Sequence, residues 1–280
     1  MKKILAVFDG YKLSKSTLAY ALELTAATDA HLVGVFLDEF IYRTYSVAKI
    51  YKSYEKPEEV INQLDEKDKI KRDEAVLQFQ KSCEKGKISF SIHRDKNIAL
   101  QELKFESMFA DLIIISEHET FNRFKEKSPT RFMKELLADV QCPVFVAPAN
   151  YKPIDKIVLL YDGAPSSVYA VKMFSYLLGN YGKVPVEVFS VKNAFMDTLH
   201  LPNNKLMREF IKRHFPTATY TVVKGDPEVQ IAAWLKNHKE NELVVLGAYR
   251  RSELSRWFKT SMADILMRDL NSPLFIASNN

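Results

Sequence analysis

Two aspartates, Asp9 and Asp162, each follow a run of apolar residues and precede a glycine. This pattern predicts a carboxylate in a turn at the end of a buried strand. Such a carboxylate can accept hydrogen bonds from a ligand. It can equally accept the amide hydrogens of the turn or of the next helix, where Asp is a favoured residue. Ser166 and Ser167 beside Asp162 are also typical of a turn or a helix cap. Asp162 is therefore a candidate for binding a ligand.

The other chemically active residue types are not spaced for catalysis or metal binding. No Gly-x-Ser-x-Gly and no Gly-x4-Gly-Lys-Ser/Thr sequence is present, so the usual signatures of a serine hydrolase and of a P-loop are missing. Several histidines lack the His-x3-His spacing of a zinc site: His93, His118, His200 and His214. Cys83 and Cys142 are expected to be buried thiols. We expect no catalytic residue, no metal and no required cofactor.

The sequence also contains an internal repeat. Residues 3–10 match residues 156–163, and the stretch around Pro143 matches the stretch around Pro273. The two matching stretches at the start of the copies are further apart in the sequence than the two at their ends, so the first copy carries an insertion. Intermediate matches place this insertion between the second and third strands of the first copy.

Each copy alternates short apolar runs with helical patterns, which is typical of a parallel sheet with crossover helices. The runs 110–116 and 242–247 are almost wholly apolar, as expected for a central strand covered on both faces. Further strands are expected at 31–36, 88–93, 186–191 and 220–225. The sequence therefore predicts an α/β fold with two tandem, open, five-stranded parallel sheets and helices on both faces. The predicted domains are residues 1–149, with the insertion at about 38–84, and residues 150–280.

Three motifs occur in the order of a known family. They are the strand followed by Asp-Gly, the sequence Gly225-Asp226-Pro227, and Ser272-Pro273 before the last strand. In this order they resemble the universal stress protein domain, closely in the second copy and more loosely in the first. The resemblance implies a Rossmann-like fold related to the adenine-nucleotide α-hydrolases, a role in stress response, and ATP or AMP bound at the carboxyl ends of the strands. It also implies that domains pair through their last strands.

The resemblance carries a candidate site in the second copy. Nucleotide-binding members of that family have Gly-x2-Gly-x9-Gly-Ser/Thr after the fourth strand, and here Arg250 and Thr260 replace the second and third glycines. Arg250 either binds phosphate through its guanidinium, fills the cleft, or is solvated. The implied binding residues are Asp162, Val191, Gly247, Arg250, Thr260 and Ser261.

The first copy departs further from the motif. Its corresponding stretch, residues 116–131, contains no glycine and adds Glu117 and Glu119, whose carboxylates would repel phosphate. Only Asp9 remains. We therefore predict that any adenine nucleotide binds the second copy and that the first copy has no conventional nucleotide site.

The insertion contains four tyrosines, followed by a charged helical pattern; they are Tyr42, Tyr45, Tyr51 and Tyr54. Tyrosine is enriched at protein interfaces. The segment is therefore either a surface that docks a protein partner or, as we slightly prefer, a flap packed over its own domain.

Composition bounds the remaining functions. The chain of 280 residues is 47% hydrophobic with a net charge of only +5, which excludes a disordered protein and does not indicate a nucleic-acid partner. No apolar run is long enough to span a membrane, and the apolar start is too short for a signal peptide, so we expect a cytoplasmic protein. The leading hypothesis is a stress-response regulator that binds ATP or AMP and self-associates or binds a protein partner. The alternative is an interaction protein that binds no nucleotide. A slow ATP hydrolase, a third hypothesis, would need a water-activating group that the sequence does not identify.

Overall fold

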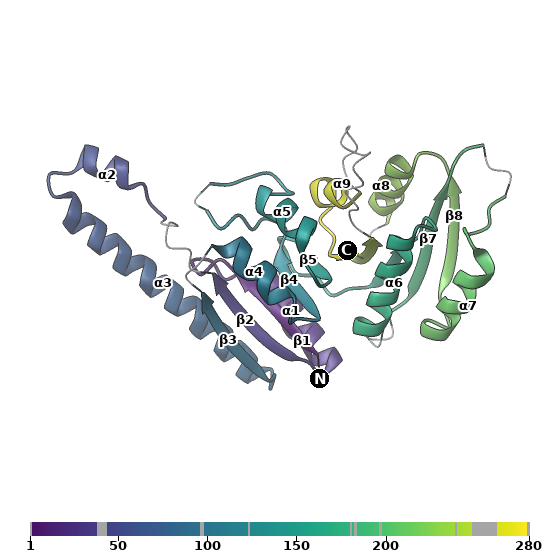
Figure 1. Ribbon diagram of the computed structural model, residues 1–280, viewed down its shortest axis with the longest axis horizontal. Coiled ribbons are helices and arrows are strands. Elements are labelled where there is room, and N and C mark those ends of the chain that lie inside the picture. Colours follow the sequence, from purple (N-terminus) through teal and green to yellow (C-terminus); the bar gives the residue numbers. More distant parts are fainter. Residues whose placement is uncertain are drawn as a thin grey trace.

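The computed structural model describes residues 2–37, 44–95, 98–122, 124–179, 181, 184–195, 198–238, 240–247 and 262–278. Strands and helices alternate along the chain, as predicted, and divide into two halves (Figure 1). The first half contains β1 (Lys3–Phe8), α1 (Lys15–Thr28), β2 (His31–Leu37), α2 (Val47–Ser53), α3 (Pro57–Lys85), β3 (Phe90–Asp95), α4 (Ala99–Ser107), β4 (Leu112–Ser116), α5 (Arg131–Asp139) and β5 (Val144–Ala147). The second half contains β6 (Lys156–Leu160), α6 (Pro165–Leu178), β7 (Val186–Lys192), α7 (Asn204–His214), β8 (Thr219–Lys224), α8 (Pro227–Asn237), β9 (Glu242–Gly247), α9 (Met262–Asp269) and β10 (Leu274–Ala277).

The ten strands form one sheet in the order β3-β2-β1-β4-β5-β10-β9-β6-β7-β8. Within each half the five strands are parallel and follow the same order, which confirms the predicted fold class. The halves join where β5 and β10 pair antiparallel, with Phe145 opposite Phe275. Because that pair is antiparallel, the carboxyl ends of the strands lie on opposite edges of the sheet in the two halves.

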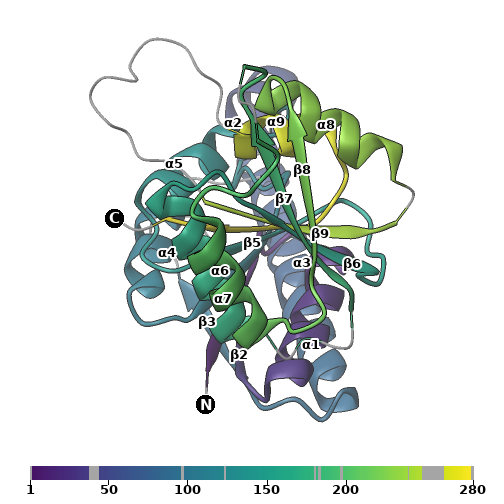
Figure 2. The ribbon, with the colours of Figure 1, turned by 90° about the vertical axis from the view of Figure 1, so that its right-hand side faces the viewer.

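Helices cover both faces of the sheet. Apolar residues of α1, α3, α6 and α7 form one buried cluster and those of α4, α5, α8 and α9 form the other. Figure 2 shows the strands of the second half between these two layers. Along β1 the side chains alternate between the clusters, with Ile4, Ala6 and Phe8 on one face and Leu5 and Val7 on the other. This two-sided burial explains why the central strands are continuous apolar runs.

Local capping explains where several helices begin. The side-chain oxygens of Ser14, Thr130 and Asp226 accept amide hydrogens in the first turns of α1, α5 and α8. In the Gly-Asp-Pro motif, Asp226 is therefore the helix cap and Pro227 the first helical residue, a position that suits its missing N–H. β3 starts at Phe90, two residues later than predicted, because the amide of Ile88 closes the end of α3 by donating to the Cys83 carbonyl.

The inserted segment between β2 and β3 projects away from the sheet (Figure 1). The last turns of α3 pack on the sheet through Ala75, Phe79 and Cys83, whereas its first half extends beyond the sheet and packs with α2. The Thr44 hydroxyl donates to the Asp68 carboxylate at 2.7 Å and thereby ties the start of α2 to α3. The predicted flap over the domain is therefore wrong for the described part of the insertion, which forms a projecting arm.

Two smaller expectations are also addressed. Cys83 and Cys142 are buried free thiols, as predicted. Among the described residues, no helix has both the length and the apolar character needed to cross a membrane.

Candidate functional site

The carboxyl ends of β6 and β9 form the candidate site of the second half. The strand order reverses between these two strands, and open α/β sheets bind ligands at such points. β6 leads into Asp162 and Gly163 and then into α6, while β9 ends at Gly247. A Cβ atom on Gly247 would lie 2.6 Å from the backbone carbonyl of Ser166, so only glycine allows the end of β9 to approach the first turn of α6 this closely.

The turn at Asp162 is ordered by its own hydrogen bond. The Asp162 Oδ1 atom accepts the amide hydrogen of Ala164 at 2.9 Å, and the side chain is exposed. Ala164 precedes α6 and has no side-chain acceptor, so α6 begins without a side-chain cap. An uncapped first turn keeps amide hydrogens available to an anion.

A loop that the sequence did not single out covers one side of this turn. Tyr161 is buried and its hydroxyl donates to the Pro202 carbonyl at 3.0 Å. A Cβ atom on Gly163 would lie 2.6 Å from Cβ of Pro202, and Gly163 has a φ of +86°. Both the close contact and the backbone conformation therefore require glycine at this position. Burial raises the pKa of Tyr161. No sequence pattern links these two segments, which meet through tertiary packing.

The predicted binding residues are only partly described. Asp162 and Gly247 come together beside α6. Val191 is on β7, half-buried against the α8 side of the sheet. The amide of Tyr161 donates to the Phe189 carbonyl at 2.9 Å, which fixes the end of β7 against Asp162. Arg250, Thr260 and Ser261 lie outside the described residues.

At the equivalent point of the first half, acidic side chains hold the turn and the end of β4. Asp9 Oδ1 accepts the amide hydrogens of Tyr11 and Lys12, both at 2.8 Å. Glu119, which follows β4, is buried close to Asp9. Burial and the negative charge of Asp9 raise the pKa of Glu119 well above its ordinary range, and Lys12 opposes this rise. A second acid, Glu117, accepts the amide hydrogen of Ala149 at 3.3 Å, and burial raises its pKa to about 7.

The inserted helix also contacts this turn. The guanidinium of Arg72, in the middle of α3, lies 4.2 Å from the centre of the Tyr11 ring and donates a hydrogen bond to the Tyr11 hydroxyl. The next residue of the helix, Asp73, pairs with Arg94 of β3 at 2.8 Å. No group of three His, Cys, Asp or Glu side chains that could hold a metal ion occurs in the described part of the chain.

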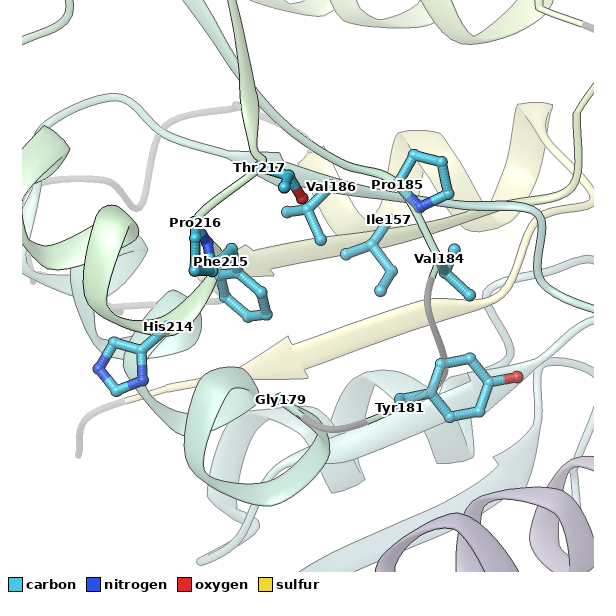
Figure 3. A pocket seen from close by; sticks show the side chains of 10 residues that line it. All are labelled: Ile157, Gly179, Tyr181, Val184, Pro185, Val186, His214, Phe215, Pro216 and Thr217. Atoms are coloured by element: carbon cyan, nitrogen blue, oxygen red, sulfur yellow. The ribbon is translucent and has the colours of Figure 1, made fainter.

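A cavity of about 570 Å³ lies elsewhere, at the amino ends of β6 and β7 (Figure 3). Its walls come from the ends of α6 and α7 and from the segments that lead into β7 and β8. This cavity is on the opposite edge of the second half from Asp162 and Gly247, because parallel strands have all their carboxyl ends on one edge. It is separate from the site that the sequence predicted.

The similarity to known proteins lies in the fold. Comparisons with protein-family models and with curated proteins gave no match to this sequence. A search of solved structures matched a universal stress protein of Archaeoglobus fulgidus DSM 4304 with a TM-score of 0.70 and 14% sequence identity, over 99% of this chain and 98% of that chain. The chain has the universal stress protein fold in two copies.

Two Pseudomonas aeruginosa structures match along the whole chain as well. A protein of strain PAO1 with unknown function has a TM-score of 0.60 and 16% identity, and the match covers 99% of this chain and 92% of that chain. A protein of strain UCBPP-PA14 that is proposed to be a universal stress protein has a TM-score of 0.61 and 16% identity, over 99% and 93% of the two chains. At identities this low, the structural matches show the fold alone, so ligand and activity have to be argued from the residues of this chain.

Proposed function

We propose that this chain is a stress-response regulator that binds an adenine nucleotide, ATP or AMP, in its second half and acts through binding rather than catalysis. The observation that carries the proposal is the close approach of Gly247 to the uncapped first turn of α6 beside Asp162, at the point where the strand order reverses. Amide hydrogens at a helix start suit phosphate, and a carboxylate at the end of β6 suits a ribose or adenine donor. The proposed binding residues are Asp162, Val191, Gly247, Arg250, Thr260 and Ser261.

The difference between the halves supports binding in the second half alone. The first turn of α1 is capped by Ser14, whose hydroxyl oxygen accepts the Thr17 amide hydrogen at 3.2 Å. Buried Glu119 and the Arg72 side chain also lie at this end of the strands of the first half. A phosphate there would meet the Asp9 carboxylate and the buried Glu119 side chain instead of free amides. We propose that the first half serves as the structural partner of the second.

Calorimetric titration of the full chain with ATP and with AMP tests this proposal. Asp162→Asn keeps the oxygen that orders the turn but removes the charge, so we expect the affinity to fall by about one to two decades, the usual effect of losing a charge-assisted hydrogen bond of about 1.5–3 kcal/mol. Asp9→Asn is the matched control at the same place in the first half, and it should leave the affinity unchanged. Equal losses in the two variants, or a loss in Asp9→Asn alone, would contradict the proposal.

A second candidate function is protein docking through the arm of the first half. Tyr51 and Tyr54 are 56% and 55% exposed at the tip of the arm, away from the sheet, although Tyr45 is engaged by the Asp65 carboxylate at 2.5 Å. Tyr42 lies outside the described residues. A chain that binds neither ATP nor AMP in the titration would leave this interaction role as the favoured function.

A further inference from the structure

The cavity at the amino ends of β6 and β7 has the size of a small-molecule site. Its volume of about 570 Å³ falls within the range of roughly 300–1,000 Å³ that is usual for ligand pockets. It is bounded by Gly179 at the end of α6, by His214 at the end of α7, and by segments that lead into β7 and β8. None of these residues belongs to the proposed nucleotide site.

The inner wall of the cavity is apolar. Ile157, Val186, Phe215 and Tyr181 line it and are themselves part of the buried cluster on this face of the sheet. Figure 3 shows Phe215 on one side and Tyr181 and Val184 on the other, with Ile157 and Val186 between them. A ligand seated here would place a hydrocarbon or aromatic body on two branched side chains and between two aromatic rings.

A polar side chain stands at the outer edge of the cavity: Figure 3 shows the His214 ring beyond Phe215, away from Ile157 and Val186. The His214 ring is packed between Tyr176 of α6 and Phe210 of α7, at centroid distances of 5.6 and 4.6 Å. The described residues provide no hydrogen-bond partner for its ring nitrogens. Thr217, on the segment before β8, is exposed at the rim and adds a hydroxyl.

The surrounding charge is positive. Lys212 and Arg213 precede His214 in the last turn of α7, and the Lys2 ammonium donates to the Leu177 carbonyl at the end of α6 at 2.6 Å. Cations therefore stand at the carboxyl ends of both helices, where they offset the negative ends of the helix dipoles. One acid contacts a residue of this wall: the Glu23 carboxylate accepts the hydroxyl hydrogen of Tyr181 at 2.5 Å.

From this lining we propose that the cavity binds a small organic acid, with an aromatic or branched hydrocarbon body against Ile157 and Val186 and its anionic group toward His214. The site is independent of the proposed nucleotide site, since it lies at the other edge of the second half. The second half would then have two separate ligand sites.

Titration of the full chain with the fluorescent anion 8-anilinonaphthalene-1-sulfonate tests the proposal, and N-phenyl-1-naphthylamine provides a probe with the same rings but no anionic group. We expect one anion-binding site per chain that excess ATP does not compete for. His214→Gln should weaken binding of the anion at least threefold and leave binding of the neutral probe unchanged. Displacement of the anion by ATP, or an equal effect of His214→Gln on both probes, would overturn the proposal.

Filling the cavity provides the second test. Val184→Trp at the half-buried wall and Thr217→Phe at the exposed rim should each weaken binding of the anion at least tenfold. The control is Val229→Trp, because Val229 is 61% exposed on α8 at the other face of the sheet. Thr217→Phe changes an exposed residue, so the test holds even where Val184→Trp impairs folding. Unchanged affinity in both filling variants would show that the probe binds elsewhere and would overturn the proposal.

Discussion

Glu242 begins β9 as a carboxylate that is only 1% exposed, and its Oε1 atom has no hydrogen-bond partner within the described residues. Three charged side chains share this end of the sheet: the Lys156 ammonium lies 2.7 Å from Glu187 and 4.9 Å from the centre of the Trp234 ring, and Glu242 faces the same layer. Burial raises the pKa of Glu242 from an ordinary value of 4.5 to about 7, despite the opposing charges of His238 and Lys156. The negative charges of Glu240 and Glu187 add to the rise.

This raised pKa predicts a loss of stability as the pH rises. The folded protein keeps the Glu242 proton between about pH 4.5 and 7, where the unfolded chain has released it, so the free energy of unfolding should fall across that window and level off above it. Glu242→Gln mimics the protonated acid. We expect the variant to match the wild type near pH 4 and to exceed it at pH 8 by up to about 3 kcal/mol, since each pKa unit is worth about 1.4 kcal/mol.

Urea unfolding at four pH values between 4 and 8 measures this difference. Glu240→Gln is the matched control in the same cluster, because the Glu240 side chain is 54% exposed and its charge is screened by water. A pH dependence that is the same in Glu242→Gln and in the wild type would contradict the assignment of the proton to this residue.

Residue patterns identified the candidate site in part. Asp9 and Asp162 have the same sequence signature, which predicted either a ligand contact or a carboxylate that orders the turn. Both carboxylates accept amide hydrogens within their turns. The sequence could not show that Arg72 would reach Tyr11, because 61 residues separate them and no motif connects them. The covering of Gly163 by Pro202 is likewise a product of tertiary packing.

At the scale of elements, the helical periodicity of apolar residues located the part of α3 that packs on the sheet. It did not show which way the rest of the helix runs. The stripe of Val76, Phe79 and Cys83 identifies the face that meets the sheet, and Phe79 and Cys83 are fully buried. The charged first half of α3 has no such stripe, so nothing in the pattern could distinguish a helix lying on the domain from one leaving it. The arm is consistent with the absence of an apolar face in this stretch.

The contact between Phe79 and Gly34 tests how α3 is seated. A Cβ atom on Gly34 of β2 would lie 2.7 Å from the Phe79 ring, which is also packed against Phe8 and Phe36 at 5.8 Å each. Gly34→Ala should destabilise the protein by about 1–3 kcal/mol through overpacking, and Phe79→Leu should destabilise it by a similar amount through the space left behind.

The double variant should be more stable than the sum of the two single changes predicts, because the smaller Leu makes room for the new methyl group. Urea unfolding of the four proteins gives the coupling energy, which we expect to be about 0.5–3 kcal/mol in favour of the pair. Strictly additive losses would mean that β2 and α3 separate freely at this point. That result would contradict the seating of α3 on Gly34.

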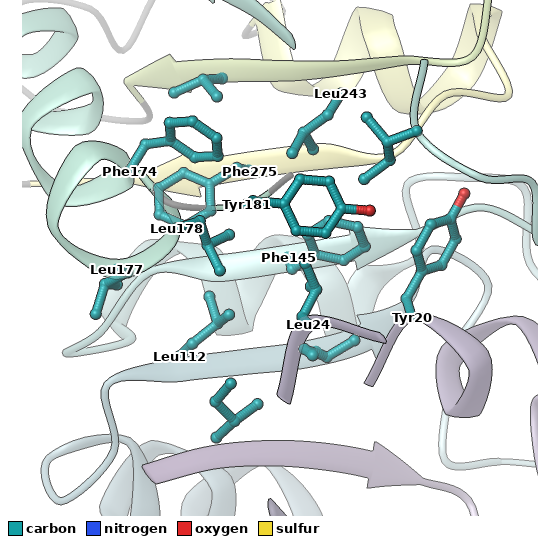
Figure 4. Packing of buried hydrophobic residues seen from close by; sticks show 14 of the residues in the cluster. Tyr20, Leu24, Leu112, Phe145, Phe174, Leu177, Leu178, Tyr181, Leu243 and Phe275 are labelled. Atoms are coloured by element: carbon teal, nitrogen blue, oxygen red, sulfur yellow. The ribbon is translucent and has the colours of Figure 1, made fainter. Parts of the chain in front are cut away.

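At the scale of the whole molecule, the two halves share one core. Tyr20 of α1 lies 5.1 Å from Phe145 of β5, Phe145 stands opposite Phe275 of β10, and Phe275 lies 5.3 Å from Phe174 of α6. Figure 4 shows these rings together with Leu24 of the first half and Leu177 and Leu178 of the second. The apolar layer is therefore continuous from one copy to the other.

Polar contacts reinforce the same junction. Glu23 of α1 accepts hydrogen bonds from the hydroxyls of Tyr181, at 2.5 Å, and Tyr151, at 3.1 Å. The Asn241 amide before β9 donates to the carbonyls of Lys152 and Pro153, at 2.8 and 2.9 Å, within the segment that connects the halves. The repeat in the sequence predicted two similar sheets, and the resemblance to universal stress proteins implied pairing through last strands. The side-chain contacts at the junction join segments that share no sequence motif, so the sequence could not predict them.

A shared core predicts that both halves unfold together. The chain has two tryptophans, Trp234 and Trp257, both in the second half, so their fluorescence reports that half, while labelling of the buried Cys83 thiol reports the first. The urea midpoints from the two probes should coincide.

Phe145→Ala removes a fully buried ring from the junction and should lower both midpoints together, at a cost of about 3–5 kcal/mol. Leu206→Ala, at a residue of α7 that is 69% exposed, should move neither midpoint. If Phe145→Ala exposed Cys83 to labelling while the tryptophan midpoint stayed in place, the halves would be independent domains that merely touch, because a core that both copies share cannot lose a ring on one side only.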